Sequence, residues 1–407
     1  MRTMQPGRHH IRNLGAAAAP AIDKRVLIVA RSARALAHAA VAGGWSPWVI
    51  DPFGDLDTRA VAYGVIQLTD LADFRFDEKS LLEAIGVFQR EAGPMPVVLG
   101  SGFEARADVV AAIARGSQIH GNGPEVISSL ADMPAVYGRL NADNGACMPL
   151  TLSDRADDDH VWLIKASGHT GGAHVRFAND RDAPGTGHYF QQYLPGRSLS
   201  GLFVAGASGS RLCGLSAHLQ WRIDPARSFR YEGARTLIEA PDSLLNRVQE
   251  MGAEVARKFG LVGCFGIDFI QRADDRVALI DINPRPTATL DLYSDKGAIF
   301  NAHMAACTTG ELLYSRPARA TTCGHLVLYA ETSWTIPARI AWPNYVADQP
   351  TAGTVIGAGA PLCTLYTSAD SARALMSTLE GLYDSFRDFV GAYREGVVPR
   401  EKGIREV

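Results

Sequence analysis

The chain has 407 residues, enough for two or three domains. With 47% hydrophobic and 20% charged residues, it has the composition of an ordinary soluble globular protein. A formal net charge of −3 provides no basic surface for nucleic acid, and no apolar run is long enough to span a membrane. The six cysteines form no CxxC pair, which argues against a zinc site or a disulfide framework and favours the reducing cytoplasm.

Residues 1–20 carry basic side chains and then an alanine run, which predicts a flexible tail and not a signal peptide. Residues 21–130 alternate between short apolar segments and helical segments. This alternation favours a parallel sheet covered on both faces, so a Rossmann-like α/β domain is expected here. Its strands are predicted at residues 24–30, 45–51, 65–68 and 96–100, and its helices at residues 32–42 and 78–90.

The turn after the first strand reads Arg31-Ser-Ala-Arg34 and lacks the glycines of a dinucleotide-binding GxGxxG turn. We therefore interpret the first domain as a scaffold that contributes to a substrate cleft. Residues 101–104 follow the fourth strand, where such a cleft would draw its side chains. A plain loop is the simpler interpretation of that segment.

A helix is predicted at residues 125–140, after a Gly-Asn-Gly-Pro break. The strand at residues 161–166 carries Lys165 and leads into a glycine-rich loop and a strand at residues 174–177. Glycines let backbone N–H groups turn toward an anion and the lysine adds charge, so a phosphate-binding loop is predicted, with a flexible turn as the alternative. The loop residues are Gly168, His169, Thr170, Gly171 and Gly172.

Residues 189–204 form an apolar strand that breaks at Pro195-Gly196, and residues 212–219 are predicted as another strand, with Arg222 soon after it. Asp242–Phe259 is the clearest helix, because its apolar residues recur every three or four positions. Asp242 is a candidate cap and Gly260 a stop for this helix.

Residues 263–271 and 276–282 are two apolar runs around a short polar link, which predicts a β-hairpin. Asp268 lies inside the first strand and Asp281 inside the second, and Asn283 points to the same face as Asp281. Two carboxylates and an amide oxygen suit Mg²⁺, and Arg285 could hold a phosphate or carboxylate in its fork. The simpler alternative to a metal site is that Asp268 and Asp281 are exposed to solvent.

Beyond the hairpin, a helix is predicted at residues 296–309, short strands between residues 324 and 365, and a final helix at residues 369–393. The segment from residue 321 to 407 is therefore expected to be a small β-rich C-terminal lobe that ends in a helix.

This order of segments resembles the ATP-grasp superfamily over roughly residues 21–310. The family's DF…(E/D)xNPR segment matches Asp268-Phe269 and the run from Asp281 to Arg285. Its ATP-binding lysine and flexible loop match Lys165 and the glycine-rich loop, and its QEYIPG-type adenine hinge matches residues 191–196. The resemblance implies an ATP-grasp domain at residues 131–320 with a lid at about residues 140–190, which follows the Rossmann-like domain at residues 21–130.

Several positions depart from the family pattern. Gln192 replaces the hinge glutamate, Ser198 stands where an acid would hold ribose, and Met133 stands where a second phosphate lysine is expected. Arg139 is the candidate substitute for that lysine. Asp281 is one methylene shorter than the usual metal glutamate.

The resemblance implies an ADP-forming ligase that uses ATP and Mg²⁺, or Mn²⁺ in its place. The enzyme would convert a carboxylate to an acyl phosphate and pass it to an amine, or less often to a thiol, in a chemistry that depends on positioning and charge neutralisation. An amino-acid-like substrate fits Arg285 as a carboxylate partner and Asp291 and Asp295 as amine partners. It would suit a ligase that joins an amino acid to a cofactor precursor, or a dipeptide-type ligase. A homodimer is expected by analogy, with no nucleic-acid or membrane partner. The implied site residues are, for metal, Asp268, Asp281 and Asn283; for ATP, Lys165, the glycine-rich loop, Gln192, Tyr193, Leu194 and Ser198; and for catalysis, Arg285 and Arg222.

Three rival interpretations compete with this one. A protein-kinase-like enzyme is rejected, because the glycine loop follows the lysine and no His-Arg-Asp catalytic loop is present. A non-catalytic ATP-binding regulatory module is motivated by Met133 and Ser198. A carboxylase-type ATP-grasp enzyme is motivated by the β-rich C-terminal segment.

Overall fold

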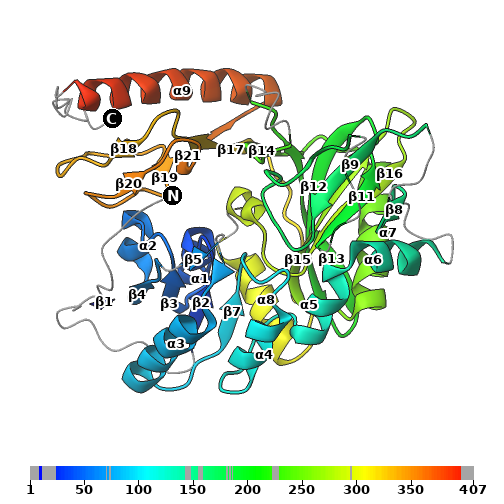
Figure 1. Cartoon of the computed structure of the whole chain (residues 1–407), viewed down its shortest axis with the longest axis horizontal. Coiled ribbons are helices and arrows are strands. Elements are labelled where there is room, and N and C mark those ends of the chain that lie inside the picture. Colours follow the sequence, from blue (N-terminus) through cyan, green and yellow to red (C-terminus); the bar gives the residue numbers. More distant parts are fainter. Residues whose placement is uncertain are drawn as a thin grey trace.

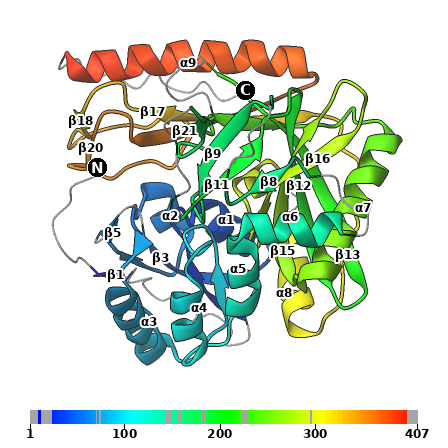
Figure 2. The same ribbon diagram turned by 45° about the vertical axis from the view of Figure 1, so that its right-hand side comes forward.

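A computed structural model describes residues 9–11, 24–69, 71–72, 75–142, 148–154, 159–179, 182, 185, 187–221, 229–293 and 296–395. The N-terminal sheet and its helices (blue) lie beside a large central sheet (green), and the C-terminal strands and helix (orange and red) lie above the N-terminal domain (Figure 1). Figure 2 shows the same arrangement after a turn of 45°, with α9 still along one side of the C-terminal strands. Within this part of the chain, no helix has both the length and the apolar character that crossing a membrane requires.

The N-terminal domain has a five-stranded sheet in the order β1-β4-β3-β2-β7, in which β2, β3, β4 and β7 are parallel. This confirms the Rossmann-like arrangement expected from the sequence. The short strand β1 lies within the segment predicted to be a tail and pairs antiparallel with β4. The elements are β1 (His9–Ile11), β2 (Arg25–Val29), α1 (Arg34–Ala42), β3 (Ser46–Asp51), α2 (Leu56–Val61), β4 (Gly64–Gln67), β5 (Leu71–Ala72), β6 (Arg75–Phe76), α3 (Glu78–Ala92), β7 (Val97–Leu99) and α4 (Ala107–Ala114).

The single helix predicted at residues 125–140 is wrong, because the structure has two helices there, α5 (Pro124–Ala131) and α6 (Met133–Asn141). Pro134 lacks a backbone N–H and disfavours helical geometry in the residue before it, so it is accommodated only in a first turn. Asp132 then caps the second helix, since its side chain accepts a hydrogen bond from the N–H of Ala135 at 3.1 Å.

The glycine-rich loop and the hinge belong to a small antiparallel sheet in the order β10-β9-β11-β8. Its strands are β8 (Thr151–Leu152), β9 (Trp162–Ala166), β10 (Arg176–Phe177) and β11 (His188–Gln192). Lys165 lies on β9 directly opposite Tyr189 of β11, so this sheet presents the lysine from its central strand.

Most of the described C-terminal strands extend the central sheet, and two of them pair separately. The eight strands are ordered β16-β15-β12-β13-β14-β17-β21-β19, and β14, which the sequence did not predict, joins the two parts. The strands are β12 (Arg197–Gly206), β13 (Gly209–His218), β14 (Gly233–Thr236), β15 (Gly263–Gln271), β16 (Val277–Asn283), β17 (Thr322–Tyr329), β19 (Val346–Ala347) and β21 (Pro361–Ala369); β18 (Trp334–Thr335) and β20 (Val355–Ile356) pair separately.

Four further helical segments flank this sheet: α7 (Asp242–Phe259), the 3₁₀ helix η3 (Ala288–Leu292), α8 (Ala298–Thr308) and α9 (Ala372–Arg394). The predicted bounds of α7 are confirmed, but Pro241 occupies the cap position and Asp242 lies in the first turn. Gly260 ends the helix as predicted, with a φ of 65° that favours glycine. Helix α9 begins later than predicted, because β21 continues through Ala369.

His303 on α8 ties the N-terminal domain to the central sheet. Its Nδ1 accepts a hydrogen bond from the N–H of Cys264 at 2.8 Å, so its Nε2–H donates to the carbonyl of His120 at 3.1 Å. The ring is 1% exposed, and this burial lowers its pKa to about 4. The neutral ring is therefore the form that the fold stabilises.

His303→Gln is expected to lower the free energy of unfolding by about 2 kcal/mol at pH 7, because two buried hydrogen bonds are disturbed. An unfolded histidine has a pKa near 6.5, so between about pH 6.5 and 4 the unfolded chain binds the additional proton. The wild-type contribution is complete above pH 6.5 and is lost as the pH falls, by up to ~1.4 kcal/mol per pH unit. The gap between variant and wild type should narrow over that range in denaturant titrations.

The wild-type profile alone cannot test this expectation. Burial raises the pKa of both Asp51 and Asp281 to about 6, so their contributions change in the opposite direction over an overlapping pH range. The contributions of Asp51 and Asp281 are the same in both proteins, so they cancel when the free energy of unfolding of the variant is subtracted from that of wild type. A gap that stays constant from pH 7 to pH 4.5 would show that His303 is not buried in its neutral form.

Candidate functional site

The hairpin of β15 and β16 brings the three predicted metal ligands together. Asp268 and Asp281 are direct cross-strand partners, next to a bulge that follows Asp268. Asn283 pairs with Gly266, and its Nδ2 lies 3.4 Å from Oδ2 of Asp268. Side chains directly opposite on neighbouring strands lie close together, so the two carboxylates share one face of the sheet.

Lys165 approaches the two carboxylates from the small sheet and is 6% exposed. Burial lowers the pKa of Lys165, while the charges of Asp281 and Asp268 raise it. Burial also raises the pKa of Asp281 to about 6, with a further upward contribution from Asp268 and a downward one from Lys165. The two acids, Lys165 and the nearby Arg285 lie together in a desolvated place, where a divalent cation would favour the charged form of both carboxylates.

The donor set fits Mg²⁺, which binds through one or two carboxylates, water and substrate phosphates. Over the described residues, no three His, Cys, Asp or Glu side chains are arranged to hold a metal ion. A cation held by Asp268, Asp281 and Asn283 would therefore need oxygen ligands from a bound phosphate, as in sites that bind metal together with a nucleotide.

Arg285 follows β16 and turns toward the N-terminal domain. Its Nη2 donates to Oδ1 of Asn283 at 2.9 Å, and its Nε donates to Oε1 of Glu104. The other carboxylate oxygen of Glu104 accepts a hydrogen bond from the N–H of Gly102 at 2.8 Å. Sequence reasoning favoured a plain loop for residues 101–104, but this loop delivers a carboxylate to the site. The sequence signal for this role was the position of the loop directly after a predicted parallel strand.

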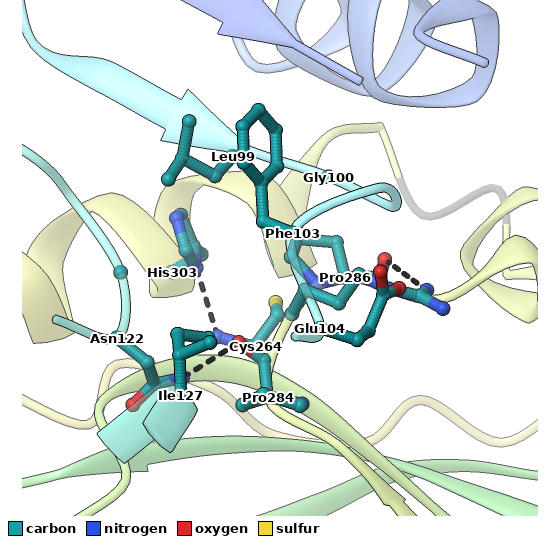
Figure 3. A pocket seen from close by; sticks show the side chains of 12 residues that line it. Leu99, Gly100, Phe103, Glu104, Asn122, Ile127, Cys264, Pro284, Pro286 and His303 are labelled. Atoms are coloured by element: carbon teal, nitrogen blue, oxygen red, sulfur yellow. Dashed lines mark hydrogen bonds and ion pairs between the residues drawn. The ribbon is translucent and has the colours of Figure 1, made fainter. Parts of the chain in front are cut away.

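A cavity of about 20 Å³, room for one water molecule, lies between Glu104, Arg285, Pro284, Cys264 and His303. Figure 3 shows Glu104 on one side of this cavity and His303 on the other. Glu104 forms an ion pair with Arg285, which also lines the cavity. The Glu104–Arg285 ion pair therefore links the loop at residues 101–104 to the segment that follows the β15–β16 hairpin.

The glycine-rich loop is packed against two other segments. Gly168, Gly171 and Gly172 all have positive φ, between 66° and 76°. A Cβ on Gly168 would lie 1.9 Å from Cβ of Ala105, and one on Gly172 would lie 1.8 Å from the carbonyl oxygen of Phe229. These glycines are needed for both backbone conformation and close approach.

Two further residues of the loop have different surroundings. Thr170 Oγ1 accepts a hydrogen bond from Nη1 of Arg31 at 3.1 Å, which links the loop to the N-terminal domain. His169 is exposed, and its Nδ1 lies 3.1 Å from the carbonyl oxygen of Ser167. Thr170 thus faces the interdomain contact, whereas His169 faces solvent.

The predicted adenine hinge lies between β11 and β12. The N–H of Gln192 donates to the carbonyl of Leu150 at 2.8 Å, and that of Tyr193 donates to the carbonyl of Val161 at 2.7 Å. Since both N–H groups are used within the protein, neither is available to adenine, and the predicted contact would use the Leu194 N–H and the carbonyl groups of residues 192–194. Tyr193 is exposed and Leu194 is partly buried.

Ser198 lies beside a histidine that sequence reasoning missed. Its Oγ is 2.9 Å from Nδ1 of His218 on β13, and Nε2 of His218 is 3.8 Å from Oδ1 of Asp268. The two residues connect the predicted ribose position to the metal hairpin. No local motif marks His218, because only the pairing of β12 with β13 and β15 brings it here.

Of the two candidates for positive charge, Arg222 lies outside the described residues and stays a prediction, as does the predicted amine partner Asp295. Arg139 is exposed and its guanidinium stacks 4.9 Å from the ring centre of Phe259, while Met133 is buried in the hydrophobic core. The expected substitution of Arg139 for the missing lysine is therefore not what the structure favours.

Lys165→Met is expected to weaken MgATP binding about 100-fold, because a charge-assisted contact to phosphate is lost. The melting temperature should not fall, since burial already disfavours the charged amine. Calorimetric titration of the variant, with the exposed Lys79→Met as control, checks both points. Unchanged nucleotide affinity would contradict the assignment of Lys165 and the glycine-rich loop to ATP binding.

The comparisons with known proteins agree with this geometry. Residues 131–289 match the family model described as the ATP-grasp domain. No curated protein matches the chain. Among solved structures, the biotin carboxylase of Campylobacter jejuni superimposes with a TM-score of 0.69 at 13% identity, covering 89% of this chain and 91% of that one.

Two other solved structures are similar to a comparable degree. The biotin carboxylase domain of 2-oxoglutarate carboxylase from Hydrogenobacter thermophilus, solved with MgADP and bicarbonate, gives a TM-score of 0.66 at 12% identity, covering 88% and 89% of the two chains. The L-amino acid ligase of Bacillus licheniformis gives 0.64 at 14% identity, covering 89% and 97%.

Identities this low show a shared fold and leave the reaction open. The matched domain contains the lysine strand, the glycine-rich loop, the hinge and the metal hairpin, all in the predicted order. Residues 131–289 therefore match the ATP-grasp domain, and the chain shares the fold of these three solved structures.

Proposed function

We propose that this protein is an ADP-forming ligase, which uses ATP and Mg²⁺ to activate a small-molecule carboxylate as an acyl phosphate and joins it to an amine. The observation that carries this proposal is the convergence of buried Lys165 on the cross-strand pair Asp268 and Asp281, with Arg285 at the end of the same hairpin. Phosphoryl transfer needs this kind of charge neutralisation and no protein nucleophile.

In the proposed reaction, a carboxylate oxygen of the substrate attacks the γ-phosphorus of ATP, and the bond to the bridging oxygen of ADP breaks. The amine nitrogen then attacks the acyl carbon, phosphate leaves, and the nitrogen loses a proton. Mg²⁺ held by Asp268, Asp281 and Asn283 would neutralise phosphate charge. Lys165 would hold the phosphates, Arg285 would orient the acyl phosphate, and the glycine-rich loop would exclude water.

The substrate proposal is an amino acid joined to a cofactor precursor. Arg285 suits a carboxylate, and one structural neighbour is by its name an L-amino acid ligase. A carboxylase-type reaction is the second candidate, because the other two neighbours are biotin carboxylases and most of the described C-terminal strands extend the central sheet. A non-catalytic nucleotide-binding module is the third, motivated by Met133 and Ser198.

Nucleotide turnover with Mg²⁺ tests the proposal. The protein is incubated with ATP and pools of amino acids, polyamines and carboxylic cofactor precursors, with and without bicarbonate. ADP and phosphate released only with a particular carboxylate and amine pool support the ligase. Release that requires bicarbonate supports the carboxylase, AMP and pyrophosphate contradict the acyl phosphate, and tight ATP binding without turnover supports the regulatory module.

A further inference from the structure

The N-terminal sheet has a topological switch point between β2 and β7. From β2 the chain proceeds to β3 and β4 on one side and returns to β7 on the other side of β2. In open α/β sheets, ligands bind in the crevice outside the carboxyl ends of the two strands at such a point. Arg31 follows β2 and the loop of residues 101–104 follows β7, and the N–H of Arg31 donates to the carbonyl of Ser101 at 2.9 Å.

The side chain of Arg31 extends from this crevice to the nucleotide site. Its aliphatic stem lies against Gly102, where an added Cβ would be 2.9 Å from Cγ of Arg31. Its Nη1 donates to Oγ1 of Thr170 in the glycine-rich loop at 3.1 Å. Arg31 therefore reaches from the N-terminal domain to the predicted phosphate-binding loop.

Two guanidinium groups lie close together at this point. Arg31 and Arg285 both lie beside Glu104, and Arg285 also interacts with Asp281. Burial lowers the pKa of Arg31, Glu104 raises it, and the positive charge of Arg285 lowers it again. A phosphoryl group placed between the glycine-rich loop and the β15–β16 hairpin could accept hydrogen bonds from both guanidinium groups.

The second phosphate lysine that the family resemblance implies is replaced in this chain by Met133. Met133 occupies the expected lysine position and is 4% exposed within the hydrophobic core. Arg139 is exposed and packs on the ring of Phe259. We propose, on the basis of the proposed function, that Arg31 of the N-terminal domain supplies the positive charge of that lysine and contacts the γ-phosphoryl group of ATP as it passes to the carboxylate.

The test compares MgATP with MgADP, since only ATP carries the γ-phosphoryl group. Calorimetric titration of the full-length protein gives the ratio of the two affinities for wild type, Arg31→Met, Arg139→Met and Thr170→Val. Arg31→Met is expected to lower the ATP affinity about 10- to 30-fold and the ADP affinity less than about twofold. Arg139→Met should keep the wild-type ratio, whereas Thr170→Val, which alters the predicted ATP-binding loop, measures how much of the change comes from the loop.

Several outcomes would overturn the proposal. If Arg31→Met keeps the wild-type ratio of ATP to ADP affinities, Arg31 does not contact the γ-phosphoryl group. If Arg139→Met lowers this ratio, Arg139 supplies the positive charge. If Thr170→Val lowers the ratio of affinities as much as Arg31→Met does, Arg31 acts only by positioning the glycine-rich loop. If Arg31→Met fails to fold, Arg31→Lys is used, which keeps the charge without the planar fork and should show an intermediate ratio.

Failure of the proposed function is distinguishable from failure of this inference. Absence of ATP turnover by the wild-type protein with every substrate pool would contradict the ligase, yet the ratio of ATP to ADP affinities would still decide the role of Arg31. Where turnover is found, Arg31→Met should lower kcat about 100-fold with a smaller change in the KM for ATP, because the contact strengthens in the transition state.

Discussion

Asp281→Asn is expected to lower Mg²⁺-dependent ATP turnover by about 10³-fold or more, because one of the two carboxylates that would neutralise phosphate charge becomes neutral. The same variant should be at least as stable as wild type at pH 7. The folded pKa of Asp281 is raised to about 6 from an unfolded value near 3.9, so the fold disfavours its charged form, and that penalty is present above pH 6 and disappears as the pH falls toward 4.

Initial rates and melting temperatures at pH 7 check this expectation together. Asp274→Asn is the matched control, because that aspartate lies on the exposed link of the same hairpin and pairs with Arg276. The control should keep full turnover. An Asp281→Asn variant that unfolds would show that the aspartate has a structural role. A variant with normal ATP turnover would show that Asp281 does not hold the metal ion.

Arg34→Met is expected to lower the free energy of unfolding by about 2–4 kcal/mol, because it leaves partly buried carboxylates without their cation. Arg34 opens α1 and is 7% exposed. Its Nε donates to Oδ1 of Asp348 at 2.8 Å, and its Nη2 donates to Asp291 of η3 and, at 3.0 Å, to Oη of Tyr366 on β21. One side chain therefore joins the N-terminal domain to the central and C-terminal segments.

Urea titration of Arg34→Met and of Arg176→Met measures this effect. Arg176 pairs with Asp182 on the surface, and its side chain is 53% exposed, so its loss should cost less than about 1 kcal/mol. Equal effects of the two substitutions would show that the Arg34 cluster is screened by solvent. The cluster also bears on the predicted amine partner, since Asp291 is already bound by Arg34 and Tyr366 in the structure.

Local pattern predicted most elements because each has a periodicity or a stop signal of its own. The spacing of apolar residues predicted α7 to the residue, and the alternation within the two runs of the hairpin predicted that Asp268 and Asp281 share one face. The errors have local causes as well. Pro134 divides one predicted helix into two, and β14 is a four-residue strand without a distinctive apolar run.

The sequence by itself predicted the resemblance to the ATP-grasp domain, the order of the glycine-rich loop, the predicted hinge and the hairpin, and the two acids on one face. These features depend on residues that are close in sequence. The tertiary structure alone decided which distant groups join them: Glu104 at Arg285, His218 between Ser198 and Asp268, Arg31 at Thr170, and Arg34 at Asp291. Such contacts follow from strand order and domain packing, which periodicity within a segment does not specify.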